Sequence, residues 1–152
     1  MREGLRMPAS EAPSTSLRFG KGIYLTDCFS KAASQCFADQ GFDSNDEGKR
    51  GIVFLVEVAL GDMHWAYQPE PLMQMPPQAH SVYGVGAQRP DIRGLVDLRS
   101  TKDNFAIDES ATDTKRQLFF NTGKMRPNPD MTQEHAQTSE QRFNEFVVFD
   151  SA

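Results

Sequence analysis

FGKGIYLTDCFSKAA, residues 19–33, is the stretch on which the fold of this chain depends. Two glycines flank a lysine and permit a tight turn, and they let the backbone approach a ligand closely because neither carries a Cβ. A short apolar strand follows, and Thr26 or Asp27 can cap the helix that comes after it. Apolar residues recur every four positions from Cys28 and from Phe29. The stretch therefore predicts a glycine turn, a strand and a helix with one buried face.

The C-terminal run FNEFVVF, residues 143–149, is aromatic and β-branched, as is typical of a strand. With the two-residue period of a strand, Glu145 shares a face with Val147 and Phe149. A carboxylate on an otherwise apolar face is costly to bury alone, so Glu145 needs a partner or a chemical role. The alternative is a glutamate at the edge of a strand, in water.

Length and composition describe one domain or part of one. The chain has 152 residues, of which 38% are hydrophobic, and a formal net charge of -5 at pH 7. The acidic balance argues against nucleic-acid binding by this segment, since phosphate recognition needs a basic surface. No apolar run approaches the roughly 20 residues of a membrane span, and the N-terminus has no signal-peptide apolar region. We therefore expect no membrane partner, and nucleic acid only through other domains.

The two cysteines, Cys28 and Cys36, both fall on the apolar face of the expected helix. They are interpreted as small core residues rather than as a disulfide, which suggests a reducing compartment. No cysteine and histidine cluster has the spacing of a zinc site, so no metal is expected.

Further elements are predicted in the middle of the chain. Residues 52–56, IVFLV, form a continuous apolar run that suits a strand covered on both faces. Prolines exclude a regular element over residues 68–79. Before them, we expect Trp65 to cap the core and His64 to be solvated. Residues 80–86, HSVYGVG, predict a second strand and loop without the full dinucleotide-binding fingerprint.

The residues themselves resemble a known family. Residues 19–33 are similar to the signature of the poly(ADP-ribose) polymerase catalytic domain, with its glycine turn, strand, tyrosine and SK-containing helix. Four more blocks follow the family's order: donor-loop-like GLR and EAP within residues 1–18, strand-like VEVALGDM at 56–63, a loop-like stretch at 80–91, and NEFVVFD at 144–150. Each block alone is a weak signal, but five in order make the resemblance specific.

The resemblance implies NAD+-dependent transfer of ADP-ribose to a protein acceptor or to a growing ADP-ribose chain, with release of nicotinamide. The transition state of this cleavage resembles an oxocarbenium ion, which a nearby carboxylate stabilises. By resemblance that carboxylate is Glu145. Tyr24 would stack on the nicotinamide ring, and Lys31 would lie near the acceptor. These three are the catalytic residues that the resemblance implies.

The resemblance also implies a cofactor-binding set: Arg6, Gly22, Tyr24, Ala32 and Gln35. Arg6 belongs to the donor loop, residues 1–18, which covers the adenosine half of NAD+ in the family. The family has a serine at the position of Ala32, which hydrogen-bonds the nicotinamide carboxamide, and a second stacking tyrosine at the position of Gln35. Because residues three apart are neighbours on a helix, we expect both departures on the same pocket wall.

The acceptor side is less readable. Leu17 and Arg18 stand where the family often has bulkier or more apolar residues, a difference that concerns chain elongation more than cofactor binding. Residues 131–142 are polar and predict a loop or a frayed helix turn. Loops on this side vary within the family, so the sequence does not specify the acceptor.

The expected fold is α+β, with a mixed or antiparallel sheet curved around an NAD+ cleft and one principal helix at residues 27–40. The family's first motif is a strand carrying His-Gly-Ser, which this sequence lacks. Residues 1–152 are therefore expected to form the C-terminal portion of a catalytic domain, incomplete at its N-terminus. By resemblance the protein would be intracellular and nuclear. The alternative is a degenerate module that binds NAD+, ADP-ribose or a partner without catalysis, which Ala32 and Gln35 favour.

Overall fold

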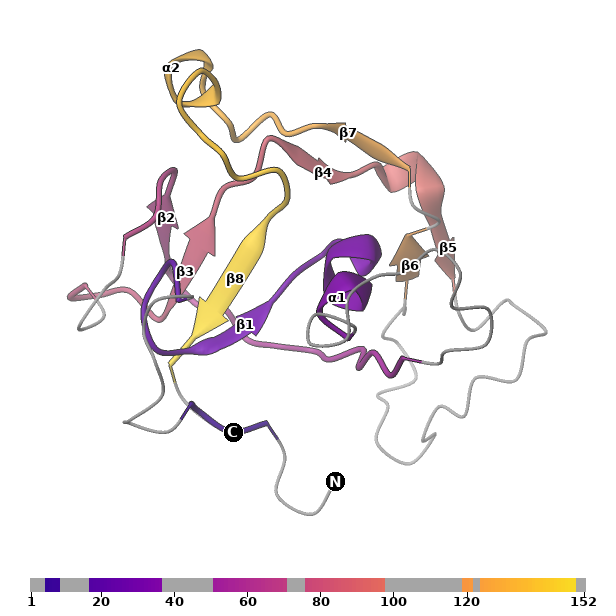
Figure 1. Cartoon of the computed structure of the whole chain (residues 1–152), viewed down its shortest axis with the longest axis horizontal. Helices are drawn as coiled ribbons and strands as arrows, with labels where there is room; N and C mark the ends of the chain where they lie inside the picture. The colour runs from indigo at the N-terminus through magenta and orange to yellow at the C-terminus, as the bar shows by residue number, and fades with distance from the viewer. Residues whose placement is uncertain are drawn as a thin grey trace.

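A computed structural model of the chain describes residues 5–8, 17–36, 51–70, 76–97, 119–121 and 124–149 (Figure 1). Its centre is a four-stranded sheet with the strand order β1-β8-β3-β2. The strands are β1 (Ile23–Leu25), β2 (Met63–Ala66), β3 (Ser81–Gly84) and β8 (Glu145–Val148). β8 runs antiparallel to β1 and β3, whereas β2 and β3 are parallel. The sheet is therefore mixed, and the α+β prediction is confirmed.

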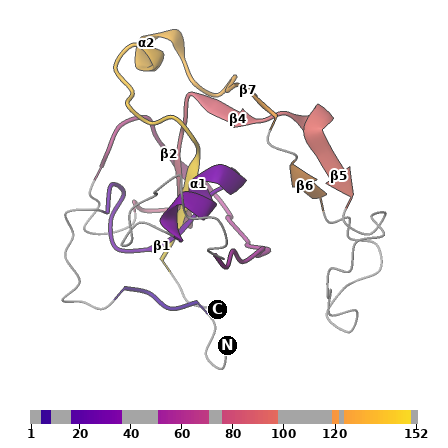
Figure 2. The ribbon, with the colours of Figure 1, turned by 45° about the vertical axis from the view of Figure 1, so that its right-hand side comes forward.

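Two smaller antiparallel pairs lie beside the central sheet (Figures 1 and 2). β4 (Gln88–Pro90) pairs with β7 (Met125–Pro127), and β5 (Leu95–Asp97) pairs with β6 (Phe119–Asn121). A 3-10 turn, η2 (Ile92–Gly94), connects β4 to β5. The sheet order shows that the first and last described strands of the chain pair directly.

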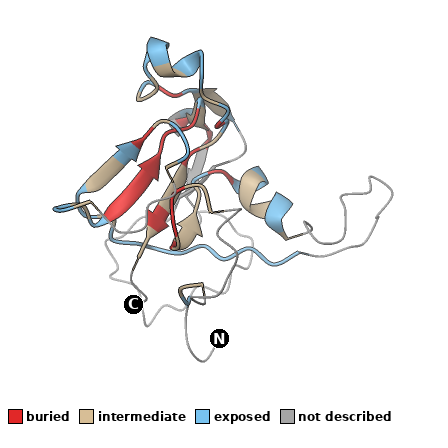
Figure 3. Cartoon of the chain, turned by 60° about the vertical axis from the view of Figure 1, so that its left-hand side comes forward, coloured by how far each residue is buried: buried red, intermediate tan, exposed pale blue. Residues whose placement is uncertain are grey.

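The core is a small cluster where β1, β3 and β8 meet. Phe19, Val82 and Val147 are fully buried, and Ala66 is 1% exposed. Val82 and Val147 face each other across the β3–β8 pair, and burial of each aliphatic side chain contributes about 1.5–3 kcal/mol. Figure 3 shows β3 as a continuously buried strand. The expected face of β8 is confirmed, because Val147 belongs to the cluster and Phe149 packs against it.

The two glycines of the opening stretch have separate structural roles. Gly20 has a φ of 93°, in the left-handed region that favours glycine. A Cβ on Gly22 would lie 2.3 Å from Val147 Cγ1, so the lack of a side chain lets this turn pack against β8. The backbone at Gly22 thus approaches the neighbouring strand closely, and the predicted close approach to a ligand stays a prediction.

The principal helix, α1 (Phe29–Gln35), is shorter than the predicted span of residues 27–40. Its N-cap is Cys28, without a side-chain hydrogen bond, so neither Thr26 nor Asp27 is the cap. Thr26 Oγ1 instead donates to the carbonyl of Asn144 at 2.8 Å and accepts from the amide of Cys28 at 3.2 Å. The Thr26 hydroxyl is thus bound to the residue that directly precedes β8, and it does not cap α1. Positions 37–40 lie outside the described residues.

The predicted buried face of this helix is wrong. None of its residues is buried, and Phe29 is 51% exposed. The helix meets the sheet through its first turn, where Cys28 is buried and Lys31 reaches β8. Cys28 and Cys36 are free thiols, which confirms that they form no disulfide, but only Cys28 is a core residue.

The strand predicted at residues 52–56 does not form. Residues 51–60 have no regular secondary structure, and Ile52 and Leu55 are 76% and 63% exposed. The strand of this region, β2, begins only at Met63. An apolar β-branched run favours a strand only when a partner strand is available, and none of the described strands pairs with it.

The side chains of β2 also differ from expectation. Trp65 is 44% exposed, so it does not cap the core, and it meets Tyr83 edge-on with ring centroids 5.3 Å apart. His64 is half-buried and bonded to Glu70 at 2.9 Å, so it is not a freely solvated histidine. The reason is the alternation of the strand, which points Trp65 outward and buries Ala66.

Residues 131–142, expected to form a loop or a frayed helix turn, contain the short helix α2 (Gln133–Ala136). Thr132 is its N-cap and accepts from the amide of His135 at 3.3 Å. The ring of His135 stacks on Tyr67, with centroids 4.1 Å apart. This contact ties α2 to the end of β2 (Figure 1).

Candidate functional site

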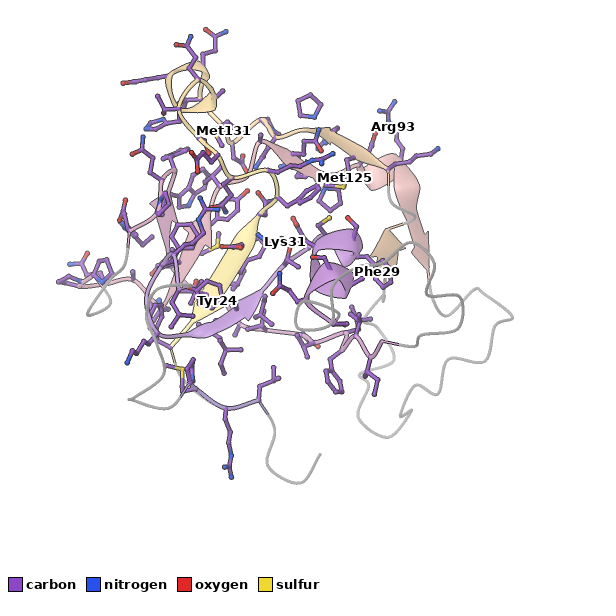
Figure 4. All side chains as sticks on the ribbon, in the orientation of Figure 1. Tyr24, Phe29, Lys31, Arg93, Met125 and Met131 are labelled. Atoms are coloured by element: carbon purple, nitrogen blue, oxygen red, sulfur yellow. The ribbon has the colours of Figure 1, made fainter. Side chains whose placement is uncertain are left out.

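The sheet and α1 bring together the three side chains expected to be catalytic. Tyr24 lies in β1 and Glu145 begins β8. Lys31, labelled in Figure 4, lies on α1 and reaches Glu145. Lys31 Nζ donates to Glu145 Oε1 in an ion pair whose side chains are 21% and 13% exposed. Residues separated by more than a hundred positions thus form one polar group at the strand–helix junction.

The two carboxylate oxygens of Glu145 differ in their hydrogen bonding. Its Oε1 is bound by Lys31, but Oε2 is buried and accepts no hydrogen bond within the described part of the chain. A buried carboxylate oxygen without a partner costs about 1–3 kcal/mol or more. A ligand that donates a hydrogen bond to Oε2 would remove this cost. The cross-strand partner of Glu145 in β3 is Gly84, which has no side chain.

Tyr24 braces the glycine turn with its hydroxyl. That hydroxyl donates to the carbonyl of Gly20 at 2.9 Å and accepts from the amide of Phe19 at 2.9 Å. Desolvation raises the pKa of Tyr24 and nearby Glu145 adds to the rise, while the hydrogen bond from Phe19 lowers it. The hydroxyl therefore stays neutral and is committed to the turn, which leaves the half-buried ring as the part that a ligand can contact. Sequence reasoning missed this brace.

A buried polar network surrounds Asn144, the residue that precedes Glu145. Asn144, 2% exposed, accepts at Oδ1 from Gly86 N at 3.0 Å, Asn128 Nδ2 at 3.0 Å and the hydroxyl of Tyr83 at 3.3 Å. Its Nδ2 donates to Asp27 Oδ2 at 2.8 Å. The residue before Glu145 is thereby fixed from four directions, and the network holds the start of β8 in register. An asparagine at the head of an apolar strand was the available signal, and the sequence reading did not use it.

Tyr83 completes the network. The single proton of its hydroxyl is shared between Asp130 Oδ2 at 3.1 Å and Asn144 Oδ1 at 3.3 Å. Its ring stacks on Phe146 with centroids 5.0 Å apart. Burial and the neighbouring Asp130 raise the pKa of Tyr83 to about 12, against a lowering by the hydrogen bond from Asn128. The carboxyl of Asp27 also has a raised pKa, because desolvation outweighs the hydrogen bond from Asn144.

A pocket of about 390 Å³ opens beside the ion pair. Its walls are α1, residues 140–143 and Arg18, and Lys31 and Gln35 line it. Ala32, half-buried, is not part of this lining, so the pocket contains only one of the two departures expected on a single wall.

Two further members of the expected cofactor-binding set lie away from this pocket. Arg6 is exposed within residues 5–8, and Gly22 is buried against Val147. Most of the donor-loop-like segment falls outside the described residues.

Metal and membrane features are absent where the structure can be read. Among the described residues, no group of three or more histidine, cysteine, aspartate or glutamate side chains could hold a metal ion. Within the same part of the chain, no helix is long and apolar enough to cross a bilayer.

Comparison with known proteins points to one family. The model of the poly(ADP-ribose) polymerase catalytic domain matches residues 1–116. The chain is 39% identical over 98 residues to poly(ADP-ribose) polymerase 1 of Danio rerio, a match that covers 64% of this chain and 9% of that protein. It is 36% identical over 121 residues to the Xenopus laevis polymerase 1, with 80% and 12% covered. It is 42% identical over 92 residues to polymerase 2 of Arabidopsis thaliana, with 60% and 14% covered.

The chain therefore spans about a tenth of the length of the curated relatives that it matches. The range matched by the family model also ends before Glu145. The position of Glu145 in the site comes instead from the pairing of β8 and the contact with Lys31.

Proposed function

Because the chain belongs to the poly(ADP-ribose) polymerase catalytic-domain family, we propose that it takes part in transferring ADP-ribose from NAD+ to a protein acceptor, with release of nicotinamide. The observation that carries the proposal is the Lys31–Glu145 pair, in which one carboxylate oxygen is bound and the other has no partner among the described residues. A growing ADP-ribose chain is the other acceptor that this chemistry allows.

Glu145 is the catalytic carboxylate of this proposal. Oε2 accepts a hydrogen bond from a ribose hydroxyl, which satisfies its buried and unpartnered position. The negative charge then lies close to the ribose carbon on which positive charge develops as the bond to nicotinamide breaks. Lys31 fixes the orientation of the carboxylate through Oε1. It also presents a cation to the acceptor side, where the incoming nucleophile needs to be held.

Tyr24 contributes its ring rather than its hydroxyl. The hydroxyl is held by the glycine turn, so it neither donates nor removes a proton in the reaction. A half-buried aromatic face beside the carboxylate suits stacking of the flat nicotinamide ring. On the donor side, the proposal gives Arg6, Gly22, Ala32 and Gln35 contacts with NAD+, with Ala32 offering no side-chain hydrogen bond.

A binding module without catalysis is the second candidate. Ala32 and Gln35 favour it, because the family's serine hydroxyl and second aromatic ring at these positions are replaced by a methyl group and an amide. Such a module would hold NAD+ or ADP-ribose but would not release nicotinamide. A nuclear location belongs to the same proposal and follows only from the family resemblance.

The test separates binding from transfer. The chain is incubated with NAD+ labelled on adenine, alone and joined to a His-Gly-Ser strand taken from a relative. We expect label on protein together with free nicotinamide from the joined form, and weak NAD+ binding and little transfer from the chain alone, whose sequence contains no His-Gly-Ser. Tight NAD+ binding by the joined form without nicotinamide release would support the binding module. Robust transfer by the chain alone would show that another residue replaces the histidine.

A further inference from the structure

The pocket beside the Lys31–Glu145 pair is rich in cations. Arg18, Lys31 and Arg142 line it, against one acidic residue, Glu140. This local excess of positive charge stands out in a chain whose formal net charge is -5. A concave surface lined by cations concentrates anions locally.

The two arginines have no carboxylate partner in the described part of the chain. No ion pair there involves Arg18, and the guanidinium of Arg142 lies over the ring of Phe143, 5.0 Å from its centroid. Elsewhere in the structure, Arg89 pairs with Asp130 and Arg93 with Asp91. Arg18 and Arg142 therefore face the pocket with their fork of N–H donors available, and such a fork matches a carboxylate.

We infer that this pocket recognises an acidic side chain of the protein acceptor: Arg18 and Arg142 bind a carboxylate that flanks the residue to be modified, and so determine acceptor specificity. The inference rests on the proposed function in one respect, that the bound protein is an acceptor of ADP-ribose. The binding itself requires no NAD+. Lys31 connects the two sites, because it lines the pocket and also contacts Glu145. A peptide anchored in the pocket would be held next to the catalytic carboxylate.

A carboxylate fits the pocket better than the nucleotide end of an ADP-ribose chain. Among the described residues, Phe143 is the one aromatic side chain in the lining, and Arg142 already lies over its ring. Recognition of a nucleic-acid base generally uses an aromatic side chain on which the base stacks. The guanidinium of Arg142 already occupies the face of Phe143 on which a base would stack. The volume of about 390 Å³ is near the lower end of the range for ligand pockets. It suits a side chain and a short piece of backbone.

The experiment measures binding of a fluorescent peptide of alternating Glu and Ser to the 152-residue chain at low salt, by anisotropy. A peptide with Gln in place of Glu is the matched ligand control. We expect Arg18→Gln and Arg142→Gln each to weaken binding of the acidic peptide about threefold, since exposed ion pairs contribute little individually. The double variant should lose roughly tenfold, if the two contacts are independent. Binding should weaken further as salt is raised.

Lys124→Gln is the protein control, because it removes one positive charge from an exposed side chain that does not line the pocket. It should leave binding unchanged within about twofold, as distant exposed charges are largely screened. Thermal melting of each variant shows whether a loss reflects unfolding.

Three results would overturn the inference: equal binding of the Glu and Gln peptides, no effect of the two pocket variants, or binding of neither peptide. A fourth is tighter binding of free ADP-ribose with the same dependence on both arginines, which would assign the pocket to the chain end instead. Failure of the proposed function gives a different pattern. The acidic peptide would then bind as described, while NAD+ yields no nicotinamide and no modified protein.

Discussion

Two runs of this chain, residues 52–56 and residues 145–148, have similar compositions and different structures. IVFLV and EFVV are both short, apolar and rich in β-branched residues. The second becomes β8, hydrogen-bonded on both sides and with Val147 fully buried. The first remains irregular, with Val53 40% exposed and Leu55 63% exposed. A run with strand propensity therefore becomes a strand only where neighbouring strands accept its hydrogen bonds.

A charge placed in each run should affect the two runs very differently. Val147→Asp should unfold the protein or cost more than about 4 kcal/mol, because it buries a carboxylate in the core cluster. Val53→Asp should change the free energy of unfolding by less than about 0.5 kcal/mol, since its side chain is partly in water. Urea denaturation of both variants measures this. Equal losses would mean that residues 51–60 are packed in solution.

The next prediction compares the carboxylates of the two regions. Glu145→Gln keeps the shape of the side chain and removes its charge, so transfer should fall by about 10²–10³ while the fold is retained. Glu57→Gln, at an exposed position of the other region, should stay within about twofold. Both are measured as NAD+-dependent modification by the form joined to a His-Gly-Ser strand. Unchanged transfer by the Glu145 variant would remove that residue from the mechanism.

A third prediction concerns the contribution of the Asn144 hydrogen bonds to the stability of the protein. Asn144→Ala leaves Gly86 N and the side chain of Asn128 short of a buried acceptor, and we expect a loss of about 1–3 kcal/mol in unfolding free energy. Thr132→Ala, at the exposed N-cap of α2, is the comparison and should cost about 1 kcal/mol. If Asn144→Ala costs no more than the cap variant, the network does not set the register of β8.

The smallest expected effect is on ligand affinity and concerns two residues of α1. Ala32→Ser with Gln35→Tyr should tighten the binding of nicotinamide-like inhibitors. A regained hydrogen bond contributes about 0.5–1.5 kcal/mol, and a stacking ring contributes a similar amount. Calorimetry of the double variant against the original chain measures the gain. Level or weaker affinity would show that α1 is aligned wrongly with the family's helix.

Sequence reasoning singled out Tyr24, Lys31 and Glu145 because the signals around them are local. The glycine turn, the strand at Tyr24 and the alternation around Glu145 each depend on residues within a few positions of one another. The five ordered blocks then gave the family, which the match over residues 1–116 supports. The prediction went wrong at the helix, where an apolar row was taken as buried although Phe29 faces solvent.

The residue types of the site and their order along the chain can be read from the sequence. It specified a strand with one carboxylate, a tyrosine after a glycine turn and a lysine on a helix. Only the tertiary structure decided which of these groups meet. It paired Lys31 with Glu145 and left Oε2 without a partner among the residues that the structure describes. It committed the Tyr24 hydroxyl to the turn and gathered Arg18 and Arg142 around one pocket. The physical reason is that propensity and periodicity act over a few residues, whereas ion pairs, buried networks and strand pairing join positions more than a hundred residues apart, and only the assembled sheet fixes those distances.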